Sequence, residues 1–505
     1  MLRRHYALLP VSIALLLGLW AGVIAVLAVT APRIYALAML VGTLMPLALY
    51  LSGNPRLFFF IGTVYTAMLG LSINFMLRTH MGGAPSFAID AVDFFLFPLL
   101  AFQIRDRLRG WRPSQRLDGV SLCWWGLIVL GLLAVALGPF RTFAAFEVVR
   151  MFKLWLLFIV VANECVREQH FRVVVLTLAA GLLTNVLVAL AQYTLRRTLG
   201  LQALGEPSDE AVRGANFGVY LSSDVFRVSG LAGHPNLFGA YIALLLPLLI
   251  GALFTAQSLW RRLLIGSVVA LGGLALLLTL SRAAWVAAAA ALLVFLLVVL
   301  PRVQWTRRHP WVKGALMASI PLATLAAAPS VIRRIQASDS GAFEFREQWV
   351  AIAWRMIGDA PVLGHGLNTF RLHVIDYAPY SASKMTDLFG PIWPVVHNAW
   401  LLVWAEQGSV GMMLFVGLHL VLLVTALRNL RLRLSDTVSM ANLGAACGVI
   451  AIMVDGLASF FTRVPAQGRM FWIVAAIIIA ADRWNRRNRA LRPDDAADRP
   501  PQAGP

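Results

Sequence analysis

Residues 7–29 read "ALLPVSIALLLGLWAGVIAVLAV", which is 23 residues in a row without a charge. A helix of about 20 apolar residues crosses the roughly 30 Å hydrocarbon core of a bilayer. The run is too long for the hydrophobic region of a signal peptide, and it lacks a clear small-residue cleavage site. We therefore expect it to be a retained first membrane span.

Similar apolar runs recur along the whole chain. Of the 505 residues, 59% are apolar and 13% are charged, and the second figure is half of the roughly 25% found in soluble domains. We predict an all-α fold, a polytopic inner-membrane helical bundle of about 12–14 transmembrane helices. The expected spans are 7–29, 34–51, 57–77, 87–104, 119–138, 145–165, 171–193, 236–255, 263–281, 283–300, 314–330, 401–427, 438–459 and 469–482.

A net charge of +19 would suggest a nucleic-acid partner in a soluble protein, but here the basic residues gather in four connections between spans. Such clusters mark the cytoplasmic side of a membrane protein. When the spans alternate from Arg3 and Arg4 inside, all four clusters and the C-terminus fall on that side. We therefore expect membrane lipids and no nucleic acid as partners of these charges, and a disordered cytoplasmic tail over 483–505. The clusters contain Arg105, Arg107, Arg109, Arg112 and Arg116; Arg302, Arg307, Arg308 and Lys313; Arg428, Arg431 and Arg433; and Arg483, Arg486, Arg487, Arg489 and Arg492.

Two long connections, 194–235 and 331–397, fall on the outer side, and loops above ~15 residues are usually functional or disordered. The second contains "FREQWVAIAWRMIGD", residues 345–359, whose apolar residues recur at helical spacing, so we predict an amphipathic helix. Pro361 ends it and "GHG", residues 364–366, supplies a turn. Such a helix could lie on the membrane surface or cover a cavity. Its apolar face consists of Phe345, Trp349, Ile352, Met356 and Ile357.

Polar residues gather at three outer helix ends. By alternation of the spans all three face the same aqueous side, where ionisable residues usually line a cavity. They are Arg227, His234 and Asn236 in "FRVSGLAGHPNLFGAY"; Arg282 in "LTLSRAAWV"; and His397 and Asn398 in "HNAWLLVWAEQGSVG".

Each cluster has a structural alternative. Arg227 would snorkel to phospholipid headgroups, and His234 would open a helix with Asn236 as its N-cap. His397 alone would be a satisfied interfacial histidine. Arg282 is harder to explain in this way, because a turn this tight needs Gly or Asn rather than arginine.

Two arginines and a histidine beside a membrane suit one kind of chemistry. The arginine fork binds phosphate oxygens in a bidentate way and stays charged, and histidine takes up a proton near neutral pH. The combination fits a substrate that loses a phosphate or diphosphate to a partner that gives up a proton. The outer loops contain no Asp-x-Asp pair and no zinc signature, so we expect neither a metal nor another cofactor.

Four stretches carry a resemblance over roughly residues 220–425. In this order, with a long outer loop between the second and the fourth, they resemble the O-antigen ligase and Wzy-type polymerase family of bacterial envelope glycosyltransferases. The stretches are "RVSGLAGHPNLFGAY", "LTLSRAAWV", "DAPVLGHGLNTF" and "HNAWLLVWAEQGSVG".

The resemblance implies a C-type, metal-independent inverting glycosyltransferase in the bacterial inner membrane, with its active site facing the periplasm. The donor would be a glycan on undecaprenyl diphosphate, and the acceptor would be lipid A-core or a growing glycan. Arg227 and Arg282 would grip the diphosphate, and His397 would act as the base on the acceptor hydroxyl. Further expected substrate-binding residues are Asn398, His234, Asn236, Arg213 and Glu406. Glu406 would alternatively pair with an arginine and orient the site.

On this reading the chain has four parts. N-terminal spans occupy 1–193, and a ligase-like catalytic region occupies 194–427, including the periplasmic loop 331–397. C-terminal spans follow over 428–482, and the tail over 483–505.

Other functions stay open. Within the family, ligation to lipid A-core, polymerisation of O-antigen or exopolysaccharide repeat units, and transfer to protein share these motifs. A lipid or polysaccharide transporter would place ionisable residues near the bilayer midplane, where only His419 and Asp455 stand. A purely structural scaffold would leave Arg282 unexplained.

Overall fold

The structure is a computed structural model that describes residues 53–111, 117–207, 220–222, 225–300, 340–379, 394–432 and 434–489. The expected spans 7–29, 34–51 and 314–330 lie outside these residues. The chain divides into two compact units, Met1–Gly62 and Thr63–Pro505.

Seven helices in the described ranges are long and apolar enough to cross a membrane. They confirm the prediction of an all-α, multi-pass membrane protein. Polar residues fix where several of them begin: Asp118, Ser258 and Ser435 each accept a hydrogen bond from a backbone N–H of the first turn, as N-cap residues do. The seven are α5 (Gly119–Leu137), α7 (Glu168–Leu195), α9 (Pro235–Thr255), α10 (Leu259–Leu278), α11 (Arg282–Val299), α17 (Ala399–Leu432) and α18 (Asp436–Asp455).

The remaining helices of the described chain are shorter or carry more charge. One of them, α19, continues to Arg489, so the first residues of the expected tail are helical. They are α3 (Pro55–Thr66), α4 (Asp93–Leu108), α6 (Arg141–Glu164), α14 (Ser340–Asp359), α15 (Phe370–Tyr377) and α19 (Pro465–Arg489), with the 3-10 turns η1 (Gln202–Leu204) and η3 (Phe461–Arg463).

The expected spans 57–77 and 87–104 are wrong at their facing ends. Helix α3 ends at Thr66, and a hairpin of β1 (Ser72–Phe75) and β2 (Phe87–Asp90) follows before α4. The strands pair antiparallel, with Ser72 opposite Asp90 and Phe75 opposite Phe87. Mean hydropathy adds up apolar residues without regard to their period, so it cannot distinguish an apolar strand from the end of a helix. A second, irregular hairpin pairs β3 (Tyr220–Ser222) with β4 (Val225–Phe226).

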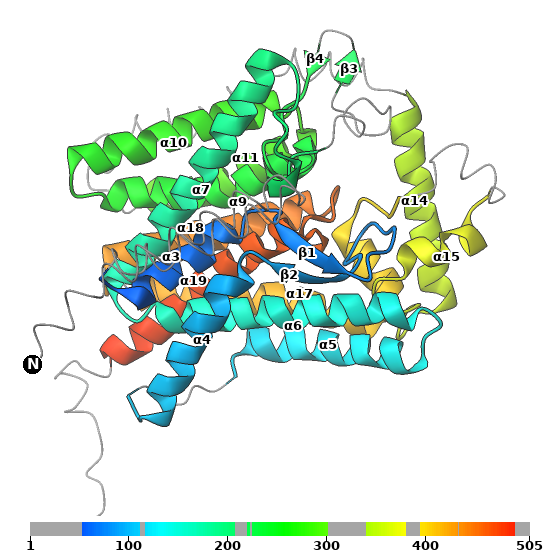
Figure 1. The fold of residues 1–505 in the computed structure, drawn as a ribbon, viewed down its shortest axis with the longest axis horizontal. Coiled ribbons are helices and arrows are strands. Elements are labelled where there is room, and N and C mark those ends of the chain that lie inside the picture. The colour runs from blue at the N-terminus through cyan, green and yellow to red at the C-terminus, as the bar shows by residue number, and fades with distance from the viewer. Residues whose placement is uncertain are drawn as a thin grey trace, which may run out of the picture. The chain divides into compact units, whose positions relative to one another are not determined.

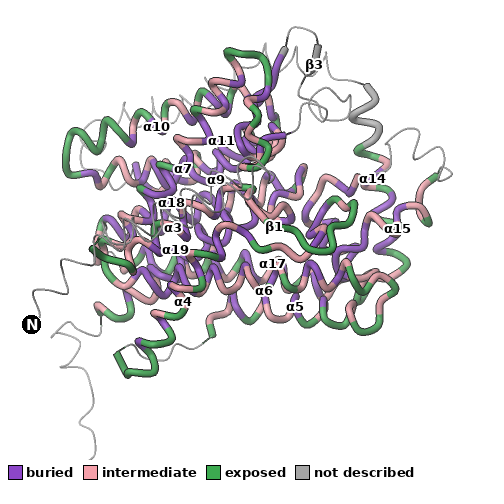
Figure 2. The backbone as a smooth tube through the Cα atoms, in the orientation of Figure 1, coloured by how far each residue is buried: buried purple, intermediate pink, exposed green. Residues whose placement is uncertain are grey.

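The centre of the second unit is the contact between α9 and α18, whose residues are mostly buried (Figure 2). Gly444 and Gly448 lie one turn apart on α18. A Cβ atom would come within 2.4 Å of the Leu248 Cα atom at Gly444, and within 2.4 Å of the Leu244 carbonyl oxygen at Gly448. Small residues spaced four apart allow two membrane helices to approach this closely.

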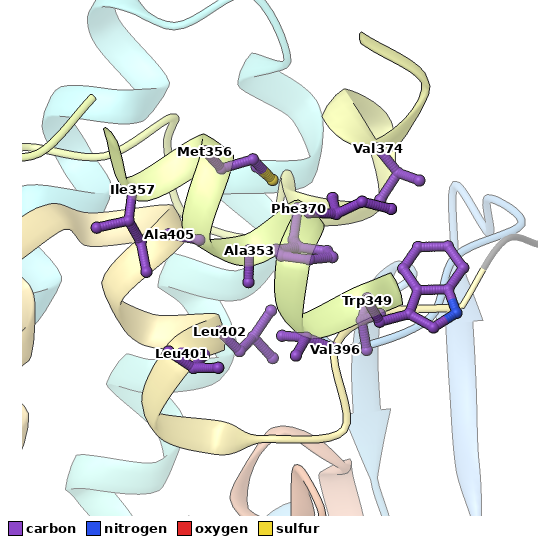
Figure 3. Packing of buried hydrophobic residues seen from close by; sticks show 12 residues of the cluster. Trp349, Ala353, Met356, Ile357, Phe370, Val374, Val396, Leu401, Leu402 and Ala405 are labelled. Carbon is purple, nitrogen blue, oxygen red and sulfur yellow. The ribbon is translucent and has the colours of Figure 1, made fainter. Parts of the chain in front are cut away.

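The predicted amphipathic helix is α14, which runs across the direction of α5, α6 and α10 (Figure 1). Its apolar face does not lie on a membrane surface, because it packs on α15 and on the start of α17 (Figure 3). From α14 this cluster takes Trp349, Ile352, Ala353, Met356 and Ile357; from α15, Phe370 and Val374; and from 395–405, Val395, Val396, Leu401, Leu402 and Ala405. The polar stretch that opens α17 is thereby joined to α14.

Candidate functional site

Arg282 is the first residue of α11 and directly follows the tight turn after α10. It is exposed, and its guanidinium has no hydrogen bond or ion pair with a described residue. A cation at a helix N-terminus opposes the helix dipole and costs about 0.3–1 kcal/mol. The same place binds anions well, because free backbone N–H groups point outward there. Arg282 therefore fits an anion site better than a role in stabilising its own helix.

The turn that carries Arg282 is held in an unusual conformation. Leu280 has a φ of 50°, a left-handed conformation that is costly for a branched side chain. Ser281 caps α11 by accepting a hydrogen bond from Ala284, and the Trp285 indole N–H donates to the Leu276 carbonyl oxygen at 2.9 Å. These contacts fix the direction in which Arg282 leaves the turn.

Arg227 lies beneath this turn and is 5% exposed. Its Nε donates to the Thr279 carbonyl oxygen at 2.8 Å, and its Nη2 donates to Asn236 Oδ1 at 2.6 Å. The alternative of an arginine reaching for lipid headgroups is therefore wrong. Arg227 connects the start of α9 to the turn before Arg282.

His234 opens α9 as the structural alternative expected, but the N-cap is His234 itself and not Asn236. His234 is the N-cap of α9, because its Nδ1 accepts the Asn236 backbone N–H at 3.0 Å. Asn236 lies inside the helix, and its side-chain oxygen receives Arg227. Pro235 causes this shift: it occupies the first helical position, which suits a residue without an N–H, and so the cap falls on the residue before it.

His397 precedes α17 and is half-buried. Its ring contacts the edge of Phe460, with ring centroids 5.3 Å apart. Loss of solvent around the imidazole, and then the charge of Arg346, lower the pKa of His397 from 6.5 to about 4. The imidazole is therefore neutral at pH 7 and able to accept a proton.

Asn398 holds the backbone next to His397. Its Oδ1 accepts the N–H groups of Trp400 and Leu401, each at 3.0 Å, and its Nδ2 donates to the Leu457 carbonyl oxygen at 3.2 Å. One N–H of the amide is left for another acceptor, and the expected substrate-binding role stays a prediction. Asn398 caps α17 and ties it to the turn after α18.

Glu406 is also engaged within the protein, as the alternative of an arginine partner predicts. The residue is 2% exposed, and its carboxylate pairs with Arg463. It also accepts the N–H groups of Asn368 at 2.9 Å and Phe370 at 3.1 Å. Arg463 in turn donates to Glu147 at 2.8 Å. Glu406 therefore fastens the segment after α14 to α17, and a substrate contact is not compatible with this geometry.

A break in α17 explains the glycine two residues after Glu406. Gly408 has φ 63° and ψ −168°, and a Cβ there would lie 2.2 Å from the Val362 carbonyl oxygen. The loop after α14 enters this break: Ser409 N–H donates to the Pro361 carbonyl at 2.8 Å, and Val410 N–H donates to the Val362 carbonyl at 3.3 Å. Only glycine combines this backbone conformation with so close an approach.

Arg346 of α14 is the residue that sequence reasoning missed. It lies one helical turn before Trp349, which shares the apolar cluster with Val396, next to His397. Partial burial and the charge of Arg282 lower the pKa of Arg346, and the charge of Arg346 acts on His397. Arg346 is therefore within electrostatic reach of both. In the sequence, Arg346 lies on the polar face of the predicted amphipathic helix. That position indicates an exposed side chain, but it does not indicate which residues lie near it.

The expected role of Arg213 and the expected metal independence are not tested by the structure. Arg213 lies outside the described residues. No group of three His, Cys, Asp or Glu side chains that could hold a metal ion occurs in the described part of the chain, and metal independence stays a prediction.

The comparison with known proteins agrees with the resemblance. Residues 267–416 match the family model described as O-antigen ligase, whereas no curated protein matches the chain. The matched range contains Arg282, Arg346, His397 and Glu406 and leaves out Arg227. It supports an enzyme of the ligase or polymerase type that transfers a glycan. Residues 267–416 of this multi-pass membrane protein thus resemble the O-antigen ligase family, and the match supports the resemblance seen in the sequence.

Proposed function

We propose that the protein is an O-antigen ligase that transfers a glycan from undecaprenyl diphosphate to a sugar hydroxyl of lipid A-core. The reaction would take place at the periplasmic face of the inner membrane, without a metal and with inversion at the anomeric carbon. The observation that carries the proposal is that Arg346 lies within electrostatic reach of both Arg282 and His397. The two arginines lack a partner among the described residues, and the histidine is neutral.

The arginines supply the fixed positive charge for the leaving group. As the bond between the anomeric carbon and the diphosphate oxygen breaks, negative charge grows on the diphosphate. Arg282 stands at a helix N-terminus, where the N–H groups and the guanidinium act on the same anion. Preorganised donors of this kind cost no rearrangement during the reaction. A metal is not needed for this charge, since arginine stays protonated.

His397 supplies the base. The acceptor hydroxyl oxygen forms the new bond to the anomeric carbon on the face opposite the diphosphate, and its proton passes to the neutral imidazole. Burial, and then the charge of Arg346, lower the pKa of His397 and keep the imidazole in its neutral form. After transfer the product carries the glycan, the undecaprenyl diphosphate is released, and the proton leaves His397 for solvent.

Arg227 takes a positioning role in this proposal. Its guanidinium is buried and bonded to Thr279 and Asn236, so it holds the turn of Arg282 instead of presenting a free fork to the diphosphate. This modifies the role that the family resemblance implies for it.

The test is glycan transfer by membrane-embedded His397→Gln at matched protein levels. Glutamine can hydrogen-bond the acceptor hydroxyl but cannot take its proton, so we expect a loss of about 100- to 10,000-fold. His373→Gln is the matched control, because His373 is a half-buried histidine of α15 outside the site. Activity should persist in EDTA. Near-normal transfer by His397→Gln would contradict the role of base, and a requirement for added magnesium or manganese would contradict the metal-independent mechanism.

A further inference from the structure

A cavity of about 320 Å³ lies apart from Arg282 and His397, which do not line it. Its walls come from the β1–β2 hairpin, the starts of α4 and α19, the middle of α6 and the turn at 231–233. Its volume is at the lower end of the roughly 300–1,000 Å³ range of small-ligand pockets. Most of its surface is apolar, and its charged and amide side chains are Asp90, Asp93, Arg150, Lys153, Gln467, Arg469 and Asn74.

The cations in this cavity are already satisfied. Lys153 Nζ lies 2.8 Å from the Ala88 carbonyl oxygen and 2.6 Å from a carboxylate oxygen of both Asp90 and Asp93, which uses its three N–H donors. Arg469 donates to Asp90 at 2.8 Å and to two backbone carbonyls at 2.8 and 2.7 Å. Arg150 pairs with Glu147.

Two acceptors in the lining have no donor. Asp93 uses Oδ2 for Lys153 and for the Asp90 N–H at 2.8 Å, while its Oδ1 has no hydrogen-bond partner. Gln467 donates through Nε2 to the Ala232 carbonyl at 2.9 Å, which directs its Oε1 elsewhere, and Oε1 also lacks a partner. Both residues are 3% exposed. A buried acceptor without a donor costs about 1–3 kcal/mol. A ligand that donates hydrogen bonds to these two acceptors therefore gains binding free energy from each of them.

This arrangement excludes three ligand classes. A phosphate would meet Asp90 and Asp93 without an unpaired cation to oppose them. A metal ion would need the place between the two carboxylates that Lys153 fills. An acyl chain would cover the two acceptors without giving them a hydrogen bond. A neutral group with O–H donors and an apolar face fits both the two acceptors and the mostly apolar lining.

We propose that this cavity is a subsite for one sugar residue of a glycan substrate, with sugar hydroxyls donating to Asp93 Oδ1 and Gln467 Oε1. The inference rests on the proposed function, in which both substrates carry sugars. The subsite is connected to the reaction centre through the chain, because Gln467 holds Ala232 in the turn between Arg227 and the cap residue His234. A sugar in the cavity would thus contact the same turn that Arg227 joins to Arg282.

Asp93→Asn is the sharpest variant. The Lys153 ammonium and the Asp90 N–H both donate to Oδ2, so the amide oxygen must stay there and the amide NH2 must replace Oδ1. The substitution therefore exchanges the unpartnered acceptor of a cavity-lining residue for a donor without a change in size. We expect KM for one sugar substrate to rise at least about 10-fold, equal to about 1.4 kcal/mol, with kcat unchanged. The thermal unfolding temperature should fall, because the buried ion pair with Lys153 loses its negative charge.

Val149→Trp is an independent variant that fills the cavity. Val149 lines it and is 41% exposed, so a larger side chain does not disturb a packed core. Val129→Trp on α5 is the matched control, because Val129 is 50% exposed and does not line the cavity. We expect Val149→Trp to raise the same KM as Asp93→Asn, and Val129→Trp to leave it unchanged.

The measurements are transfer kinetics of the full chain in lipid nanodiscs, with the donor and the acceptor varied in turn. A rise in KM for the donor alone assigns the sugar to the donor glycan, and a rise for the acceptor alone assigns it to the acceptor. Unchanged KM values in both variants overturn the subsite and leave a cavity for water only. A fall in kcat without a rise in KM also overturns it, because that result indicates a structural role.

A second readout separates this inference from the proposed function. Methyl glycosides of common hexoses should raise the thermal unfolding temperature of the wild type and not that of Asp93→Asn, whereas inorganic phosphate should not act through this cavity. If the wild type transfers no glycan, the proposed function fails, and the glycoside shift still decides the subsite. No shift with any glycoside, together with unchanged KM values, contradicts it.

Discussion

Arginine and lysine should not be equivalent at residue 282. Lysine keeps the charge but loses the planar fork that binds two phosphate oxygens. We expect Arg282→Ala to lower the transfer rate by about 100- to 1,000-fold, and Arg282→Lys to be impaired as well. The measurement is glycan transfer in membranes at equal protein levels. If Arg282→Lys equals the wild type, the residue is a headgroup anchor.

The pH dependence of transfer tests the neutral state of His397. The pKa of about 4 keeps the base deprotonated, so its protonation should not slow the reaction between pH 7 and about 5. Removing the nearby positive charge in Arg346→Gln should raise the pKa of His397, because a cation disfavours the imidazolium. The acid limb of the pH–rate profile should then move to higher pH. An unmoved limb would contradict the electrostatic influence of Arg346 on His397.

The sequence could not predict which of the two arginines, Arg227 or Arg282, is left without a partner among the described residues. Arg227 and Arg282 both stand in polar stretches at helix ends, and both suit an anion. The distinction depends on Thr279 and Asn236, which come to Arg227 only when α9 and α10 are packed. Arg346 was missed for the same reason: its polar helix face is visible in the sequence, but the neighbour of that face depends on how α14 docks on α17.

At the level of secondary-structure elements, the break in α17 predicts how a substitution at Gly408 affects stability. Gly408→Ala should destabilise the protein by about 1–3 kcal/mol from its left-handed backbone alone, and more from the contact with Val362. Gly417→Ala in the same helix is the matched control, because its Cβ would meet only Cys123 Sγ at 3.6 Å. Alanine there should be neutral or stabilising by up to about 1 kcal/mol. Thermal unfolding in detergent measures both, and equal midpoints would contradict the account of the break.

Elements were predictable where a single property decides them. Apolar length places α5, α7 and α9 within a few residues, because hydrocarbon thickness sets that length. The amphipathic period also places α14 correctly. The β1–β2 hairpin was not predictable in this way, since its apolar residues add to the mean hydropathy of the helices on both sides.

Orientation is the prediction that belongs to the whole molecule. With residues 331–397 periplasmic and both ends cytoplasmic, a reporter that works only in the periplasm should be active when fused after Ala378. The same reporter should be silent when fused after Leu434. These fusion points lie on either side of α17, so one span separates them. A reversed pattern would place the site on the cytoplasmic side and contradict the proposed function.

Acid should also weaken the fold as a whole. Burial lowers the pKa of His80 to about 4, as it does for His397. A histidine whose pKa is lower in the folded protein than in the unfolded chain stabilises the fold at pH values above about 6.5, its pKa when unfolded. This stabilisation is lost as the pH falls toward 4. Each contributes a slope of about 1.4 kcal/mol per pH unit in that window.

The loop that enters the broken helix has a kinetic consequence. The amide hydrogens of Ser409 and Val410 lie in an apolar span, yet they are bonded to carbonyls of Pro361 and Val362. Their exchange with deuterium therefore follows the lifting of that loop, together with α14 and Arg346, and not the fraying of α17. A substrate that holds α14 in place should slow exchange at these two amides more than at the ends of the same helix. Two backbone hydrogens thus report on how firmly α14 and its following loop are docked on α17.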